Sequence, residues 1–469
     1  MTGALAVVGS GAPPASIGEA VAAQARPNIV VIETDDQTLE SMRVMDNVNS
    51  LIGDRGATFQ NSFANYSLCC PSRATFLTGD YMHNHRVLGN KYPSGGFRRF
   101  QELHGNDHLA VWLLRAGYYT AMIGKYLNEY ANDPPVPPGW SEWRAAPEGY
   151  GVYNYPLNEN GTLVNYGQDP TDFKQDVLTR KAVNLVNRRA PLARPFFLWL
   201  TYTAPHVGEP PNPNPPGNCQ ASAKPAPRHA HAFDFQPLPR SPNFNEPSVF
   251  DKPAKVRNRP RLNADQIAEI QRKYRCELES LLSVDEGVKK VVDALRAKTE
   301  LWNTVLIYTS DNGYFHGEHR IPKDKQHIYE ESIRVPLQMR GPGIPRGVQV
   351  GSLAINADLA PTLVDLANAN PGEAMDGRSL IPVANHPGIE QGRELLIEEP
   401  SFKAIRTERY MYAEHYTGEK ELYDLMNDPF ELVSRHNDAA YASIRGQLAA
   451  ELQKLRSCGG SGCRLHSTP

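Results

Sequence analysis

A short run that begins at Cys69 combines two thiols with a cation at a predicted turn. Cys69 and Cys70 are adjacent, and neighbouring cysteines cannot easily form a disulfide with each other. Pro71 fixes its own φ and donates no hydrogen bond, so we expect a turn there, with Ser72 as N-cap of the following helix. Arg73 then lies near a helix start, where a positive charge is unfavourable unless an anion is close. The run indicates a site, although a buried cysteine pair is the simpler alternative.

Two short apolar runs, residues 28–33 and 304–309, are followed directly by oxygen-bearing side chains. These side chains are Asp35, Asp36, Asp311 and Asn312. Adjacent carboxylates at the end of a buried strand are costly without a cation, although one Asp could instead cap the next helix. Three carboxylates and an amide are hard ligands with no Cys/His cluster among them, so the set favours Ca²⁺, or less readily Mg²⁺, over Zn²⁺.

Basic side chains follow other predicted strands. Lys125 lies just beyond the strand predicted over 117–123, and His206 follows the strongly apolar run 195–202. A third basic group, Lys325, lies in a loop beyond Asp311. Each could have a simpler role, because a lysine can extend to solvent and a histidine can be structural. As a site, the same groups would bind an anion and supply a general acid.

These residues share a position relative to the predicted strands. Strands and helices alternate over residues 26–370, which predicts an α/β fold with a large, mostly parallel, doubly wound sheet. In such sheets ligands bind in the crevice at the carboxyl ends of the strands. We therefore expect the acidic and basic groups to share one crevice, arranged to hold a tetrahedral oxyanion and stabilise its displacement.

The chain divides into four predicted parts. Residues 1–25 are a signal-peptide remnant or a disordered tail, and 26–384 form the catalytic domain. Within that domain, 207–260 are a proline-rich insert. Short strand-like runs after 385 predict a small antiparallel subdomain through 469, closed by a helix. We also expect a helix or a helix pair over 264–298, from apolar residues at helical spacing.

Composition restricts the class of protein. The 469 residues are 22% charged with a formal net charge of −3, which is typical of globular proteins and argues against a general nucleic-acid binder. No apolar run reaches the length of a membrane span. Oligomeric state is not readable from the sequence.

Cysteine usage and the N-terminus favour an exported protein. Residues 23–25 read Ala-Gln-Ala, a signal-peptidase pattern, although no basic residue precedes them. Cys458 and Cys463 flank a glycine-rich spacer and could close a small loop, and Cys219 and Cys276 could form a second bridge. Spacing alone does not fix which cysteines pair.

The run from Cys69 to Gly79 resembles the signature of the formylglycine-dependent sulfatase family, C-x-P-S-R-x-x-x-L-T-G. That family has an alkaline-phosphatase-like fold. Other matching pieces, in order, are Asp35-Asp36, Gly124-Lys125, Ala204-Pro205-His206, Asp311-Asn312-Gly313, and Lys325 four residues before Tyr329-Glu330. Residues 77–85, 124–130 and 324–330 look most like N-acetylglucosamine-6-sulfatases, so the 6-sulfate of N-acetylglucosamine is the expected substrate.

The resemblance implies a covalent mechanism. Cys69 would be oxidised by a maturation enzyme to formylglycine (3-oxoalanine), whose hydrate attacks sulfur and then expels sulfate. His206 and Lys325 would neutralise or protonate the departing alcohol, Lys125 would bind a sulfate oxygen, and Arg73 would hold the hydrate. The implied metal ligands are Asp35, Asp36, Cys69, Asp311 and Asn312.

The chain departs from the family pattern in one place. Many sulfatases carry a histidine two residues after the lysine equivalent to Lys125, as the base for sulfate release. Here that position is Leu127. Asn128 is shared with the N-acetylglucosamine-6-sulfatase-like pattern, which implies a contact with substrate. Two rivals remain: a phosphate ester or phosphonate hydrolase of the same fold, and a secreted glycan-binding protein with unmodified Cys69.

Overall fold

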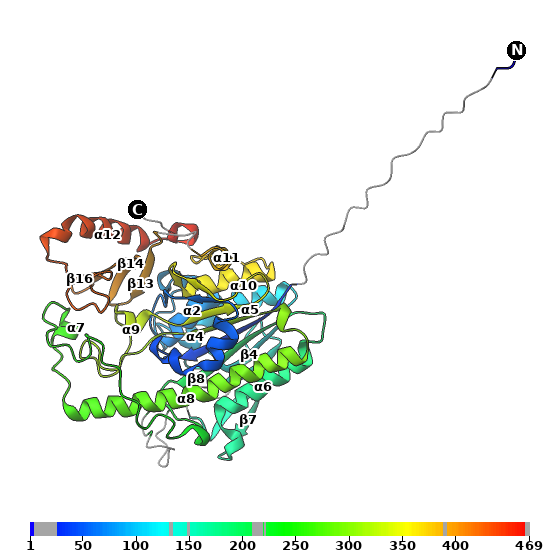
Figure 1. Ribbon diagram of the computed structural model, residues 1–469, viewed down its shortest axis with the longest axis horizontal. Coiled ribbons are helices and arrows are strands. Elements are labelled where there is room, and N and C mark those ends of the chain that lie inside the picture. The colour runs from blue at the N-terminus through cyan, green and yellow to red at the C-terminus, as the bar shows by residue number, and fades with distance from the viewer. Residues whose placement is uncertain are drawn as a thin grey trace.

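The structure is a computed structural model (Figure 1). It describes residues 1–3, 26–130, 135–147, 151–208, 219, 222–387 and 392–464. Most of the predicted export segment, including the Ala-Gln-Ala pattern, lies outside these residues. Among the described residues, no helix has the length and apolar character needed to cross a membrane.

A ten-stranded sheet forms the centre of the molecule. Its strands are β1 (Asn28–Asp35), β2 (Ala57–Phe59), β4 (Tyr119–Lys125), β5 (Glu142–Ala146), β6 (Tyr155–Glu159), β7 (Thr162–Tyr166), β8 (Phe196–Pro205), β9 (Thr304–Ser310), β10 (Leu337–Arg340) and β11 (Val348–Val350). Their order is β11-β2-β10-β9-β1-β8-β4-β5-β6-β7. The centre, from β9 to β5, is parallel, and β10, β6 and β7 are antiparallel to their neighbours. The predicted mostly parallel α/β sheet is confirmed.

Helices cover both faces of the sheet (Figure 1). One face packs against α2 (Cys69–Thr78), α4 (Gly96–His104), α5 (Leu109–Arg115), α10 (Leu359–Ala367) and α11 (Ile381–Asn385), and the other against α6 (Lys174–Arg189) and α8 (Ala264–Ala297). Strand β1 is buried on both sides: Ile29 and Val31 pack toward the first set of helices, and Val30 and Ile32 toward the second. This explains its uninterrupted apolar run. The region 264–298, predicted as a helix or a pair, is one helix.

A second, antiparallel sheet forms the C-terminal subdomain. Its strands are β13 (Leu395–Glu399), β14 (Phe402–Arg406), β15 (Tyr410–His415) and β16 (Lys420–Asp424), in that order, and α12 (Ala442–Leu455) packs beside them (Figure 1). Of these strands, β16 was not expected from the sequence. The remaining short elements are α1 (Asp46–Val48), β3 (Ser62–Phe63), α3 (Met82–His85), α7 (Ala254–Arg257), α9 (Glu330–Ile333) and β12 (Ala354–Ile355).

Two disulfides are present, one between distant segments and one within a short local loop. Cys219 in the insert is bonded to Cys276 on α8, and Cys458 is bonded to Cys463. Both bridges raised by the sequence are therefore present. Cys69 and Cys70 are free thiols and are buried.

Candidate active site

Helix α2 carries the signature, and it begins earlier than the sequence predicts. Cys69 is its first residue and the extended Leu68 is its N-cap. The expectation that Ser72 caps the helix is wrong, because Pro71 lies inside the first turn, where the missing N–H costs no intrahelical hydrogen bond. The helix ends at Gly79, whose φ of 78° is the left-handed conformation that glycine adopts readily. The sulfur of Cys69 is thus held at a rigid, buried helix start.

Ser72 has a different role from the one expected. Its hydroxyl donates to the backbone carbonyl of Asp311, and the side-chain amide of Asn356 donates to the Ser72 oxygen at 2.9 Å. Ser72 therefore fastens the signature helix to the end of β9. Sequence reasoning missed Asn356, which follows β12 and has no neighbouring motif.

Arg73 is fully buried and makes contacts along its whole guanidinium. Its Nε donates to Asp311 Oδ2 at 2.9 Å and its Nη1 to the Lys125 carbonyl at 2.9 Å, while Nη2 lies 3.4 Å from Glu33 Oε1. Burial opposes its charge, but Glu33 and Asp311 outweigh that effect and raise the pKa of the guanidinium. The anion expected near this helix start is therefore present. Glu33 was not predicted from the sequence, because within a buried strand it carries no distinguishing pattern.

The two carboxylates at the end of β1 serve one site in spite of being adjacent. Neighbouring side chains on a strand normally point to opposite faces. Asp36 has a φ of 66°, a left-handed conformation unusual for a non-glycine residue, and this breaks the alternation. Ligand atoms of Asp35, Asp36, Cys69 and His206 consequently all lie within 4.8 Å of one another.

The end of β9 completes the acidic side of the site. The backbone N–H of Asp36 donates to Asp311 Oδ1 at 3.2 Å, and the amide of Asn312 donates to Asp36 Oδ1 at 2.6 Å. All of these residues lie at the carboxyl edge of the parallel strands, as the alternating pattern predicted. Four oxygen-bearing side chains from two neighbouring strands therefore converge.

Two lysines compensate the acidic charges. Lys125 Nζ contacts Asp35 Oδ2, and Lys325 Nζ contacts Asp36 Oδ1. Lys325 Nζ also lies 2.9 Å from Cys69 Sγ and 3.3 Å from Asn312 Oδ1. Burial opposes ionisation of both aspartates, but Lys125 and Lys325 respectively, each aided by His206, lower the pKa of the two carboxyls.

The thiol of Cys69 is not activated in this form. Burial, and after it the charge of Asp35, raises the pKa of the Cys69 thiol to about 12, despite the two lysines. The thiol lies 3.4 Å from Asp35 Oδ1, to which it donates. An unmodified Cys69 would therefore be a poor nucleophile at neutral pH.

His206 lies just beyond β8, where the sequence placed it. Its Nδ1 is 2.8 Å from the Val207 carbonyl, so Nδ1 must carry the proton of that hydrogen bond. Nε2 is 3.6 Å from Asp36 Oδ2, and the side chain is one-fifth exposed. The imidazole therefore forms part of the rim of the cluster and is open to solvent.

Leu127 and Asn128 follow Lys125 but take part in other contacts. Leu127 is 2% exposed and packs in the apolar core between the sheet and helix α5. The Asn128 carbonyl accepts a hydrogen bond from the Phe97 N–H at 2.7 Å. The predicted substrate contact of the Asn128 side chain stays a prediction.

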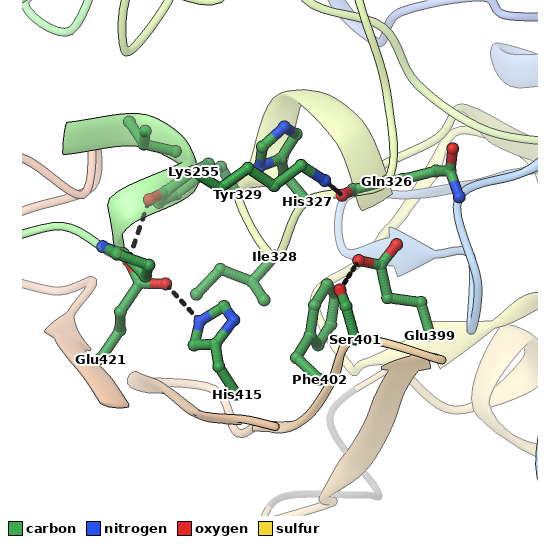
Figure 2. A pocket seen from close by; sticks show the side chains of 12 residues that line it. Lys255, Gln326, His327, Ile328, Tyr329, Glu399, Ser401, Phe402, His415 and Glu421 are labelled. Atoms are coloured by element: carbon green, nitrogen blue, oxygen red, sulfur yellow. Dashed lines mark hydrogen bonds and ion pairs between the residues drawn. The ribbon is translucent and has the colours of Figure 1, made fainter. Parts of the chain in front are cut away.

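A small pocket beside Lys325 lies between the catalytic domain and the C-terminal sheet (Figure 2). Gln326, Ile328 and Tyr329 line one side and Glu399 and His415 the other. It encloses only ≈ 20 Å³, room for about one water molecule and far too little for a sugar, so it is not a substrate site.

Two protein-family models match this chain. Residues 27–369 match the model of the family named Sulfatase, and residues 317–458 match the C-terminal region of N-sulphoglucosamine sulphohydrolase. The first match contains every acidic and basic residue of the cluster. The second includes the C-terminal sheet.

Similar proteins of known name and a similar solved structure include sulfatases and a protein that binds a sulfated sugar. The human N-acetylglucosamine-6-sulfatase is 36% identical over 94% of this chain and 86% of its own length. A Sulf-1 extracellular sulfatase homologue from Caenorhabditis elegans is 36% identical over 76% of this chain, which spans only 48% of that protein. A protein solved in complex with its substrate D-glucosamine-2-N,6-O-disulfate superposes with a TM-score of 0.76 and 26% identity, covering 92% of this chain and 97% of the other.

Proposed function

This chain belongs to the sulfatase family, and we propose that it removes the 6-sulfate from N-acetylglucosamine 6-sulfate or from sulfated sugars that end in it. Family membership makes it an enzyme that hydrolyses sulfate esters. The choice of sugar is supported by the 36% identity with the human N-acetylglucosamine-6-sulfatase. The single observation that carries the proposed sulfatase chemistry is the position of Cys69 at the start of α2. Its sulfur faces Lys325 Nζ at 2.9 Å and Asp35 Oδ1 at 3.4 Å, inside a cluster of oxygen donors and cations.

Cys69 converted to formylglycine would supply a hydrated aldehyde as the nucleophile, and this explains why the thiol itself need not be reactive. The residues around it hold its position. Arg73 fixes Asp311, and Ser72 fixes the backbone of the same residue, so α2 and the end of β9 cannot separate. A nucleophile fixed in this way loses little entropy on reaching the reactive geometry.

The donor set suits a divalent cation. Carboxylates from Asp35, Asp36 and Asp311 with the amide oxygen of Asn312 are hard ligands, which fits Ca²⁺ better than Mg²⁺ with its strict octahedral demand. The ion would lower the energy of negative charge that develops during sulfate transfer. The fully buried Arg73 holds the Asp311 carboxylate in place for this role.

The basic residues would bind and release the substrate. Lys125 and Lys325 offer ammonium groups to the sulfate oxygens, and both are nearly buried, so their charges act at low screening. His206 Nε2 faces the same cluster from the open rim and can donate a proton to the departing alcohol when the ring is protonated. Asn128 is the proposed sugar contact.

The cellular setting follows from the same evidence. Two disulfides and relatives described as extracellular favour a secreted or extracytoplasmic enzyme. Glycosaminoglycan degradation is then the fitting process, because the substrate of one solved relative is a disulfated glucosamine. The partners required are a formylglycine-generating maturation enzyme and a sulfated carbohydrate.

A substrate panel tests the proposal. The protein is co-expressed with a formylglycine-generating enzyme, and conversion is measured by mass spectrometry of the peptide that contains Cys69. Turnover is then compared on N-acetylglucosamine 6-sulfate, galactose 6-sulfate, an aryl sulfate and an aryl phosphate. Preference for the first substrate supports the proposal. Faster turnover of aryl phosphate would favour a phosphoester hydrolase, and an intact thiol without turnover would favour a glycan-binding protein.

A further inference from the structure

A second, largely buried group of possible metal ligands lies where the C-terminal subdomain meets the catalytic domain. We call His319, Glu331 and Glu431 the junction cluster. One ligand atom from each lies within 4.8 Å of the others, and His319 Nε2 is 4.0 Å from Glu331 Oε2. His319 follows the active-site residues of β9, Glu331 is on α9, and Glu431 follows β16. Three separate segments thus converge.

Two carboxylate oxygens in the junction cluster lack hydrogen-bond partners. Glu431 is 1% exposed; its Oε2 accepts from the Glu330 N–H at 3.0 Å, but its Oε1 has no partner. Glu331 Oε1 accepts from the Asn243 amide at 2.7 Å, and its Oε2 has none. A buried carboxylate oxygen without a partner is costly, so each calls for a proton or a cation.

The neighbouring Lys and Arg side chains form ion pairs with other carboxylates. Among the described residues, no Lys or Arg lies within ion-pair distance of Glu331 or Glu431. The nearby Lys252 faces Glu246 at 3.6 Å, and Arg406 pairs with Glu330 at 2.8 Å. Burial raises the pKa of Glu331 to about 8, and burial and the adjacent glutamates raise the pKa of Glu431 well above its usual value. As carboxylates, the two side chains would therefore carry negative charge that no directly paired Lys or Arg of the described residues compensates.

His319 is arranged as a metal-ligating imidazole is in other proteins. Its Nδ1 is 2.9 Å from Glu246 Oε2, so Nδ1–H donates to that carboxylate and the Nε2 lone pair is directed away from it. Burial, and after it Lys252, lowers the pKa of the ring well below its usual value, so the ring is neutral. The side-chain amide of Asn243 donates a long hydrogen bond to His319 Nε2 at 3.2 Å. The same amide also donates a shorter hydrogen bond to Glu331 at 2.7 Å.

We propose that His319, Glu331 and Glu431 bind a second divalent metal ion, of the class that takes one imidazole and two carboxylates, with Zn²⁺ favoured and Mn²⁺ next. An imidazole ligand distinguishes this site from a calcium site, whose ligands are all oxygen. Ligands about 2.1 Å from a tetrahedral Zn²⁺ are roughly 3.4 Å apart, so the 4.0 Å separation needs only a small rotation of the side chains.

The site is accessible to an ion from outside. Glu331 lines an open cavity of ≈ 220 Å³ together with Glu318 and Phe430, so an ion can reach it without unfolding of the domain. The bound ion would join the segment after β16 to the loop and helix that flank Lys325. Its role is therefore structural: it would fasten the C-terminal subdomain to the segment that carries part of the active site.

Metal analysis tests the inference without using activity. Purified protein is incubated with CaCl₂ and ZnCl₂, freed of unbound metal by gel filtration, and analysed by mass spectrometry for both elements. We expect one Zn²⁺ per chain that Ca²⁺ does not displace. Glu431→Gln keeps the shape and the bond to Glu330 but removes a ligand charge, so its affinity for Zn²⁺ should fall at least about tenfold.

Two control variants distinguish binding at the junction cluster from binding at another buried carboxyl or at the active site. Glu399→Gln changes a carboxyl that is also buried and also has an unpartnered oxygen, and it should retain the Zn²⁺. Asp36→Asn alters the active site and should lose Ca²⁺ but keep Zn²⁺. Wild-type protein with no Zn²⁺, or with the same Zn²⁺ content as Glu431→Gln, would overturn the proposal and indicate that the buried glutamates are protonated instead. Either result would leave the sulfatase proposal untouched.

Discussion

The active-site cluster and the junction cluster both include residues of the segment from Asn312 to Glu331, yet they compensate negative charge in opposite ways. In the active site each aspartate contacts its own cation: Lys125 on Asp35, Lys325 on Asp36 and Arg73 on Asp311. In the junction cluster, among the described residues, Glu331 and Glu431 have no such partner. Asp35 and Asp36 therefore stay ionised at neutral pH, and Glu331 and Glu431 require a proton or a metal.

This difference matches two tasks. A site that binds a sulfate ester needs cations in place before the anion arrives, and the aspartates keep the lysines charged and oriented. A structural site needs only one ion, which stays bound and is not exchanged during turnover. The pKa values follow the same division, because nearby cations lower those of Asp35 and Asp36 while burial raises those of Glu331 and Glu431.

The largest effect should come from Cys69, on which all the active-site charges converge. Cys69→Ala removes the nucleophile, and sulfatase activity should fall by at least about 10⁴-fold with the circular dichroism spectrum unchanged. Cys70→Ala is the matched control, because Cys70 is equally buried but packs in the apolar core. It should lose some stability and keep most of its turnover. Full activity in Cys69→Ala would refute the mechanism.

Arg73 tests whether the paired charges of the active site depend on each other. Arg73→Met should destabilise the fold by about 3–5 kcal/mol, because Asp311 and Glu33 would be left buried without their cation. Denaturant unfolding measures this free energy. The control is Arg43→Met: Arg43 pairs with Glu40 near the surface, with about a third of its side chain exposed, and its loss should cost about 1 kcal/mol or less. Equal losses of unfolding free energy in the two variants would show that the buried ion pairs of Arg73 stabilise the fold no more than the exposed pair of Arg43.

Sequence reasoning located most of the residues that the structure brings together in the candidate active site, because they follow strand ends in a regular α/β pattern. Asp35, Lys125, His206 and Asp311 each come after a recognisable apolar run, and the carboxyl ends of parallel strands meet at one edge. The central sheet and its helices were predictable for the same reason. Boundaries were less so, as the early start of α2 shows.

What the sequence could not provide are contacts between distant, unpatterned residues. Glu33 sits in a buried strand and Asn356 in a short connection, and only the fold brings them to Arg73 and Ser72. The junction cluster is the extreme case. His319 and Glu431 belong to different parts of the chain and share no local spacing, so nothing in either neighbourhood indicates that they meet.

Lys325 probes the charge balance within the active site. Lys325→Ala should lower kcat/KM by about 10²–10³-fold, the cost of removing one donor to the charge of the transition state. It should also raise the pKa of Asp36, since Lys325 is the main cation that lowers it. The acid limb of the rate profile should then move to higher pH. Lys323→Ala, in the same loop but exposed, should change neither quantity. An unshifted profile in Lys325→Ala would argue against the pairing with Asp36.

The smallest effect should come from Glu399, a carboxyl that resembles the junction cluster but has no imidazole partner (Figure 2). Burial raises the pKa of Glu399 to about 7, above the roughly 4.3 of an unfolded chain. The folded protein therefore holds this proton more tightly, and stability falls as pH rises through that window and then levels off. Glu399→Gln should remove the fall: its free energy of unfolding should match the wild type near pH 4 and exceed it by about 2–3 kcal/mol at pH 8. Denaturant unfolding across this pH range measures the difference. If the difference in free energy of unfolding between Glu399→Gln and the wild type is the same at both pH values, Glu399 does not take up a proton on folding. A proton would then not be what stabilises this buried carboxyl.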